Sequence, residues 1–221
     1  MQLRGIQFGD YHTAEDWGLT LHEKNITPPV PKTNYVSVPG RDGDIDLTEA
    51  LSGVVNYEDR KASYMFLLTD GSHEEREQLI AEIIGVLHGK SLNIIDTDDY
   101  PDYYMTGRLT VTSVFNNNAY GGLNLEAICN PWRYSQNDSM KSQTVTPSDG
   151  TVTLNISNRG YKVVTPLITV TGSVTLTYGT TSTVLSAGTY KLSNLQFMPG
   201  LNTLTVAGSG TIQFSFTEAI F

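Results

Sequence analysis

The stretch Ile168-Thr-Val-Thr-Gly-Ser-Val-Thr-Leu-Thr-Tyr178 places an apolar residue at nearly every second position, with threonine or serine between them. Successive side chains of a β-strand point to opposite faces, so this period predicts strands that are buried on one face only. The alternation recurs at Val152 to Ile156, Tyr190 to Leu192, Leu204 to Val206 and Ile212 to Phe216. Turn residues separate the runs, including Asn158-Arg-Gly160, Pro199-Gly200 and Gly208-Ser-Gly210, which is interpreted as a hairpin turn. Many short strands at this spacing predict a β-sandwich or jelly roll, with Phe221 packed at the end of the sequence.

The first half carries one predicted helix. Ser72-His-Glu-Glu75 is a capping box, in which each end residue can accept a hydrogen bond from the other's backbone amide. Apolar residues then recur on one helical face, and Gly89 can adopt the left-handed conformation that ends a helix. A helix from Ser72 to His88 is therefore expected to lie against a sheet. The strands expected around it are Tyr35 to Val38, Tyr64 to Leu68, Leu92 to Ile95, Arg108 to Phe115 and Leu123 to Ile128.

Charge divides the chain in two. Residues up to Ser135 include 20 acidic and 10 basic side chains, whereas the remainder has 3 acidic and 4 basic ones and is rich in Thr, Ser, Gly and Val. The stretch from Ser135 to Gly150 is polar and has few apolar anchors. This pattern predicts a mainly β protein with an α+β domain at residues 1–135, a linker at 136–149 and a β domain at 150–221.

Composition disfavours several classes of function. The formal net charge is −9, and the scattered basic residues do not provide the cluster that phosphate binding needs. Cys129 is the single cysteine, and we expect it to be a buried hydrophobe rather than a nucleophile. The residues from Met1 to Ile6 lack the apolar run of a signal peptide, and no stretch approaches a membrane span, so neither export nor membrane insertion is expected.

Candidate chemical sites are weak. Asp42-Gly-Asp-Ile-Asp46 and Asp96-Thr-Asp-Asp-Tyr100 have alternating carboxylates but lack the glycine and the final glutamate of a helix-loop-helix calcium site. Asp98, Asp99 and Asp102 could supply a glycosidase pair, but nothing in the sequence indicates a cleft or a raised pKa. The four histidines show no metal-binding spacing. We therefore expect no catalytic residue, no metal and no cofactor. Both acidic clusters are interpreted as solvated turn carboxylates, with irregular cation binding as the alternative.

Seven short stretches of the sequence form an ordered set of motifs. They are Ser37-Val-Pro-Gly-Arg-Asp-Gly-Asp-Ile-Asp-Leu-Thr-Glu49, Tyr57-Glu-Asp-Arg60, Leu87-His-Gly-Lys90, Tyr103-Tyr-Met-Thr-Gly-Arg108, Asn130-Pro-Trp-Arg-Tyr134, Pro166-Leu-Ile-Thr-Val-Thr-Gly172 and Phe197-Met-Pro-Gly-Leu-Asn-Thr-Leu-Thr-Val206. Over nearly the whole chain this order resembles the distal tail proteins, baseplate hub components of long-tailed, non-contractile phages and their prophages. The motif residues, which are also possible interface residues, are Pro39, Gly40, Arg41, Asp42, Gly43, Asp44, Asp46, Arg60, Gly107, Arg108, Pro131, Trp132 and Tyr134.

The resemblance implies a virion structural protein. A ring-forming N-terminal domain and a galectin-like C-terminal β-sandwich would form a homohexamer at the tail tip, made in the cytoplasm of a bacterial host. Its implied partners are the tail-tube protein, a tail-tip or tail-associated protein and a receptor-binding protein, and DNA would pass through its channel without specific binding. The acidic first half would then suit the channel wall. A carbohydrate-binding adhesion module for host cell-wall polysaccharide is the alternative function, and a wall hydrolase is a third.

Overall fold

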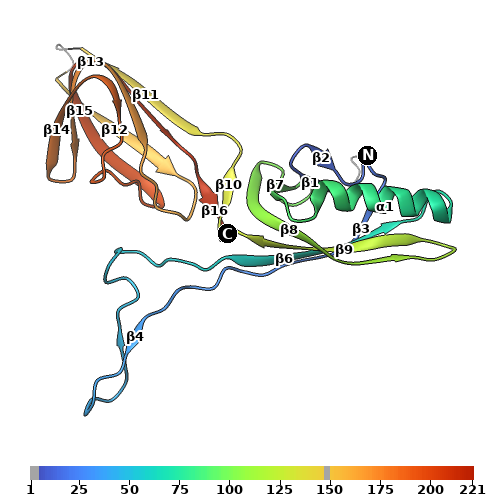
Figure 1. Cartoon of the computed structure of the whole chain (residues 1–221). Helices are drawn as coiled ribbons and strands as arrows, with labels where there is room; N and C mark the ends of the chain where they lie inside the picture. Colours follow the sequence, from blue (N-terminus) through green and yellow to red (C-terminus); the bar gives the residue numbers. More distant parts are fainter. Residues whose placement is uncertain (1–4, 147–149) are drawn as a thin grey trace. The chain divides into compact units, whose positions relative to one another are not determined.

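The computed structural model describes residues 5–146 and 150–221 (Figure 1). The chain is built mostly of β-strands, which confirms the expected fold class. It divides into two compact units, an N-terminal unit of the described residues up to Arg133 together with Phe221, and a C-terminal unit from Tyr134 to Ile220. A membrane-spanning helix is absent from the described residues, because α1, the helix found there, is too short and too polar to cross a bilayer.

An antiparallel sheet forms the N-terminal unit, in the order β2-β1-β7-β8-β9-β6-β3. Its strands are β1 (Ile6–Phe8), β2 (Tyr11–His12), β3 (Thr20–Ile26), β6 (Arg60–Leu68), β7 (Ser91–Asp96), β8 (Tyr103–Asn116) and β9 (Gly121–Cys129). A separate two-stranded ladder, β4 (Tyr35–Val36) with β5 (Ile45–Asp46), lies in the long connection between β3 and β6.

Helix α1 (His73–Leu87) confirms the prediction made from the capping box. The Glu75 amide donates to Ser72 Oγ at 3.3 Å, and the Ser72 amide donates to Glu75 Oε2 at 2.7 Å. This charge-assisted bond holds the pKa of Glu75 below its usual value. After Leu87 the chain turns at Gly89, which has a φ of 76°.

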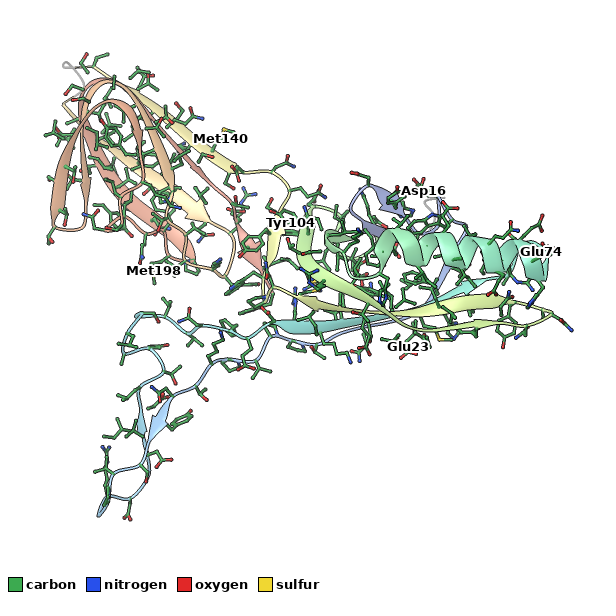
Figure 2. All side chains as sticks on the ribbon, in the orientation of Figure 1. Asp16, Glu23, Glu74, Tyr104, Met140 and Met198 are labelled. Carbon is green, nitrogen blue, oxygen red and sulfur yellow. The ribbon has the colours of Figure 1, made fainter. Side chains whose placement is uncertain are left out.

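The sheet buries one face beneath the helix. In β6 the side chains of Ala62, Tyr64, Phe66 and Leu68 are buried, whereas the residues between them are not. Phe66 meets Phe8 edge-on at a centroid distance of 6.2 Å, and Ile83 and Leu87 of α1 belong to the same core. Glu23, labelled in Figure 2, projects from the opposite face of the sheet. That face is therefore free for contacts outside the core.

The C-terminal unit is a five-stranded antiparallel sheet ordered β11-β15-β13-β14, in which β12 also pairs with β15. Its strands are β11 (Ser139–Val145), β12 (Thr151–Asn158), β13 (Leu167–Tyr178), β14 (Thr181–Tyr190) and β15 (Gly200–Phe216). Two short strands, β10 (Arg133–Ser135) and β16 (Ala219–Ile220), pair with each other. Phe197, Phe214 and Phe216 lie in a core that all five strands of the sheet help to form.

Two local predictions for this unit are wrong. Gly208-Ser-Gly210 is not a hairpin turn, because both glycines lie inside the continuous strand β15. A Cβ at Gly210 would stand 1.8 Å from the carbonyl oxygen of Thr171, so glycine lets β15 lie close against β13. The predicted linker at 136–149 contains β11, whose polar residues are held by backbone pairing with β15; its residues 147–149 lie outside the described residues.

Two glycines of the N-terminal unit provide a matched test of packing. A Cβ at Gly122 would stand 2.2 Å from the Phe66 carbonyl oxygen and 2.6 Å from Cζ of Phe115, whereas one at Gly85 in α1 would meet nothing within 4 Å. We expect Gly122→Ala to lower the free energy of unfolding by about 1–3 kcal/mol through overpacking. Gly85→Ala should raise it by about 0.5–1 kcal/mol through helix propensity.

Urea denaturation followed by tryptophan fluorescence measures both effects, because Trp17 and Trp132 belong to the N-terminal unit. Equal stability of the two variants would contradict the close approach at Gly122.

Candidate functional site

The long connection between β3 and β6 is the part of the N-terminal unit with the least structure of its own. We call residues 27–59 the arm. Apart from the short ladder of β4 and β5, it contains only turns and isolated bridges, and none of residues 30–59 is buried. Figure 1 shows the arm leaving the sheet on the side away from α1, and Figure 2 shows its side chains projecting without a second layer over them. An element this exposed is held by its two ends rather than by a core.

The tip of the arm carries the acidic motif found in the sequence. Gly40 and Gly43 have φ values of 80° and 71°, and the Arg41 amide donates to the Val38 carbonyl at 3.2 Å. Pro39 to Gly43 thus form a turn followed by a bend. Asp42 and Asp44 are exposed beside it.

Asp46 follows the tip on β5. Hydrogen bonds from Thr48, including its amide at 2.9 Å from Oδ1, hold the pKa of Asp46 below its usual value. This carboxylate therefore stays charged at neutral pH. Within the described residues no group of three or more His, Cys, Asp or Glu side chains could hold a metal ion.

Three aromatic rings fix the root of the arm. Trp132 stacks on Phe221 with centroids 4.3 Å apart, and Tyr57 meets both rings edge-on at 5.4 and 4.9 Å. Tyr57 also forms an isolated β-bridge with Pro31, on the segment of the arm that follows β3. Next to it, the Glu58 amide donates to the Val30 carbonyl at 2.8 Å. We call Tyr57, Trp132 and Phe221 the root cluster. The expectation that Phe221 packs is confirmed, and the cluster gives the arm a defined point of departure.

Arg60 begins the return strand next to the root cluster and is only 3% exposed. Its Nη2 donates to Met105 Sδ at 2.7 Å, and its Nε has no hydrogen-bond partner among the described residues. Burial, together with the nearby charge of Arg133, lowers the pKa of Arg60 to about 10, so the guanidinium stays positive at neutral pH. Arg133 in turn lies over the ring of Tyr100, 4.1 Å from its centroid. Both cations are structural features of the sheet rather than exposed binding groups.

The other motif residues do not gather at one place. Gly107 is required by packing, because a Cβ there would lie 2.5 Å from Sγ of Cys129. Arg108 is exposed on β8 and donates to the Gly89 carbonyl at 2.7 Å, Pro131 precedes Trp132, and Tyr134 lies in the C-terminal unit. There the Tyr134 hydroxyl accepts from Lys162 Nζ at 2.8 Å. The motif thus combines arm, root and sheet positions rather than a single pocket.

Asp99, one of the candidate catalytic carboxylates, is engaged in an ion pair. Lys24 binds Asp96 at 2.5 Å and Asp99 at 2.7 Å, linking β3 to the turn after β7. Burial lowers the pKa of Lys24, but the bonds to Asp96 and Asp99 outweigh it and leave the pKa raised. Burial raises the pKa of the Cys129 thiol to about 11, which keeps it protonated and unreactive. Asp96, Asp99 and Cys129 are thus used in structural contacts.

Comparison with known proteins concerns the fold. No protein-family model matches the sequence, and no curated protein matches it either. A solved structure that does match is the crystal structure of the SPP1 Dit protein, described as a paradigm of the hub adsorption apparatus in phages that infect Gram-positive bacteria. The match has a TM-score of 0.70 and 14% sequence identity, and it covers 98% of this chain and 99% of that one.

The chain has the Dit fold. Because the match spans both units, it confirms, at the level of the fold, the resemblance to distal tail proteins that the motifs indicated. The structure adds what the sequence could not, which is that the acidic motif lies at the tip of one arm and Trp132 at its root. Sequence reasoning missed the arm as a single element and missed Tyr57 and Phe221 as partners of Trp132. The available signal was the density of prolines and glycines between Pro28 and Gly53, without a matching apolar period.

The root cluster yields a test. Trp132→Ala removes two ring contacts, each worth about 0.5–1.5 kcal/mol, so opening of the root should become roughly tenfold or more frequent. Hydrogen exchange should then accelerate at the amides of Lys32 and Glu58, which bond across the root to Asn56 and Val30.

The matched control is Tyr120→Ala, which removes an edge-on contact with Phe115 in the β8–β9 hairpin. If both variants change exchange at the root equally, the cluster does not hold the arm.

Proposed function

We propose that this protein is a structural hub at the distal end of a phage tail, where it forms a hexameric ring that joins the tail tube to tip proteins and receptor-binding proteins. The observation that carries the proposal is the match to SPP1 Dit over nearly the full length of both chains. The same likeness supports a location in the virion tail. Under this proposal the N-terminal unit forms the ring and the C-terminal unit faces outward.

The arm supports assembly with further copies. Its exposed apolar side chains are Val30, Tyr35, Val36, Val38, Leu47 and Leu51, and Leu51 is fully exposed. Several exposed apolar side chains on one segment that has no core of its own are typical of an interaction surface. A ring contact is heterologous, meaning that one surface of each subunit meets a different surface of the next. The arm would be one of these two surfaces.

The free face of the sheet supports the channel. Glu23 of β3, Lys61 and Ser63 of β6 and Glu126 of β9 lie on the face opposite α1, and Lys61 pairs with Glu126 at 2.8 Å. Because the charges of Lys61 and Glu126 cancel, the carboxylate of Glu23 gives this group of side chains a net negative charge. Such a wall would not retain the phosphate backbone of passing DNA.

Carbohydrate binding by the C-terminal unit has weaker support. The hydroxyl of Tyr178 donates to the Gln196 carbonyl and that of Tyr190 to the Ser186 carbonyl, each at 2.9 Å. Both rings are also partly buried against the core of the unit. The structural role is the stronger candidate.

Light scattering coupled to size exclusion tests the ring. The wild-type protein should elute at about six times its subunit mass of 24.3 kDa. Val36→Asp with Val38→Asp should lower the assembled fraction at least tenfold, because burying unpaired carboxylates in an apolar contact is costly. Val184→Asp, at an exposed apolar position of the C-terminal unit, is the control and should leave the ring intact. A monomeric wild-type protein that is retained on purified cell wall would instead favour the adhesion module.

Charge reversal tests the channel face. Glu23→Lys with Glu126→Lys should make the assembled protein bind double-stranded DNA at low salt, with binding lost as salt rises. Glu74→Lys with Glu77→Lys on α1 makes the same change of charge on the helix, away from this face. Equal DNA retention by the two variants in a mobility-shift assay would contradict a channel lined by this face.

A further inference from the structure

A shallow hollow lies at the C-terminal end of α1. Ile84 and His88 line it on the helix side, and residues 111–114 of β8 line it on the sheet side, enclosing about 260 Å³. Val114 is 49% exposed there, whereas Met105 and Leu109 of the same strand are buried. The hollow is therefore an apolar surface open to solvent.

The same segment of β8 is an open edge. β7 pairs with β8 from Met105 to Arg108, the Leu109 amide donates to the Lys90 carbonyl at 2.8 Å, and the Val111 amide donates to His88 Nδ1 at 3.1 Å. Beyond these bonds, Thr112, Ser113 and Val114 are exposed, and the pairing of β8 with β7 has already ended at Arg108. An exposed strand edge accepts a further extended segment through its backbone groups.

Positive charge lies at the same end of α1 as the hollow. The described basic residues of the N-terminal unit are used in three ways: Lys24 and Lys61 are ion-paired, Arg60, Arg76 and Arg133 are buried, and Lys32 and Arg41 belong to the arm. The others among the described residues are Lys90 and Arg108, both exposed and both next to Gly89, whose carbonyl Arg108 binds. In a strongly acidic unit, this end of α1 is a local cationic surface.

The tip of the arm is complementary to this surface. It presents the carboxylates of Asp42, Asp44 and Asp46 beside the exposed apolar side chains of Val36, Val38 and Leu47, and its strands are extended and short. In the chain itself the arm points away from α1 (Figure 1), so the tip does not occupy the hollow of its own subunit. The tip of a second copy carries the negative charge and the apolar side chains that complement this end of α1.

We infer that the arm tip of one subunit docks in the hollow between α1 and β8 of a neighbouring subunit, with its acidic residues against Lys90 and Arg108. This inference rests on the proposed ring and names the surface that receives the arm. Docking would cover Val114 and give the open edge of β8 a backbone partner. The attraction between the acidic tip and Lys90 and Arg108 would set the register of the contact. Repulsion between like charges would keep the tip away from the acidic remainder of the neighbouring unit.

A charge swap tests the contact. Lys90→Glu with Arg108→Glu alters the hollow, and Asp42→Lys with Asp44→Lys alters the tip. Each double variant alone should need a roughly tenfold higher concentration to assemble, measured by light scattering. A one-to-one mixture of the two should regain the wild-type assembly, because alternating subunits then place opposite charges at every contact. Lys141→Glu with Lys191→Glu, at two exposed lysines of the C-terminal unit, is the matched control and should assemble normally.

Cross-linking gives an independent measurement. Asp44→Cys combined with Thr112→Cys should form, under mild oxidation, a ladder of covalent oligomers, while buried Cys129 takes no part. If the wild type forms a ring but the hollow variant assembles normally and no ladder appears, the docking surface is wrong and the proposed ring stands. If the wild type forms no ring, the proposed function itself fails.

Discussion

The burial of one face of the N-terminal sheet under helix α1 is the contact on which the rest of this unit depends. Phe66, Leu109 and Leu125 come from three adjacent strands and share a core with Ile83 and Leu87 of the helix. Because strand side chains alternate, this burial assigns the intervening residues to the opposite face. It also fixes the ends of β3 and β6, from which the arm departs. The free face, the arm root and the hollow at the end of α1 are all positioned by the same packed layer.

Sequence reasoning succeeded where the signal is local. Ser72 and Glu75 bond to each other across one helical turn, so the start of α1 could be predicted from four residues. Gly40 and Gly43 likewise specify the turn at the tip of the arm. Sequence reasoning failed where pairing between strands that are distant in the sequence decides the local structure. β11 carries few apolar residues and becomes a strand because β15 pairs with it. Gly208 and Gly210 lie inside β15 and do not end it, because β13 pairs with that part of the strand.

The candidate site was only partly visible in the sequence for a related reason. The motif residues were identified, but their roles differ: Gly107 makes room for Cys129, Arg60 is a buried cation, and Trp132 holds Tyr57 and Phe221. Tyr57 and Phe221 are 164 positions apart in the sequence, and no periodicity connects them. The match to the SPP1 Dit structure at 14% identity shows the same separation between fold and sequence. Layered packing tolerates many apolar substitutions, so a fold can be kept while most of its residues change.

The exposure of the arm has a consequence for how copies of this chain would assemble. An open row of subunits linked arm to neighbour has one contact fewer than it has members, whereas a closed ring has as many contacts as members. The last contact forms within a complex that is already held together, so it avoids most of the loss of translational freedom that each earlier step incurs. Partial rows would consequently be sparse at equilibrium, and assembly would be cooperative without any change of shape within the sheet.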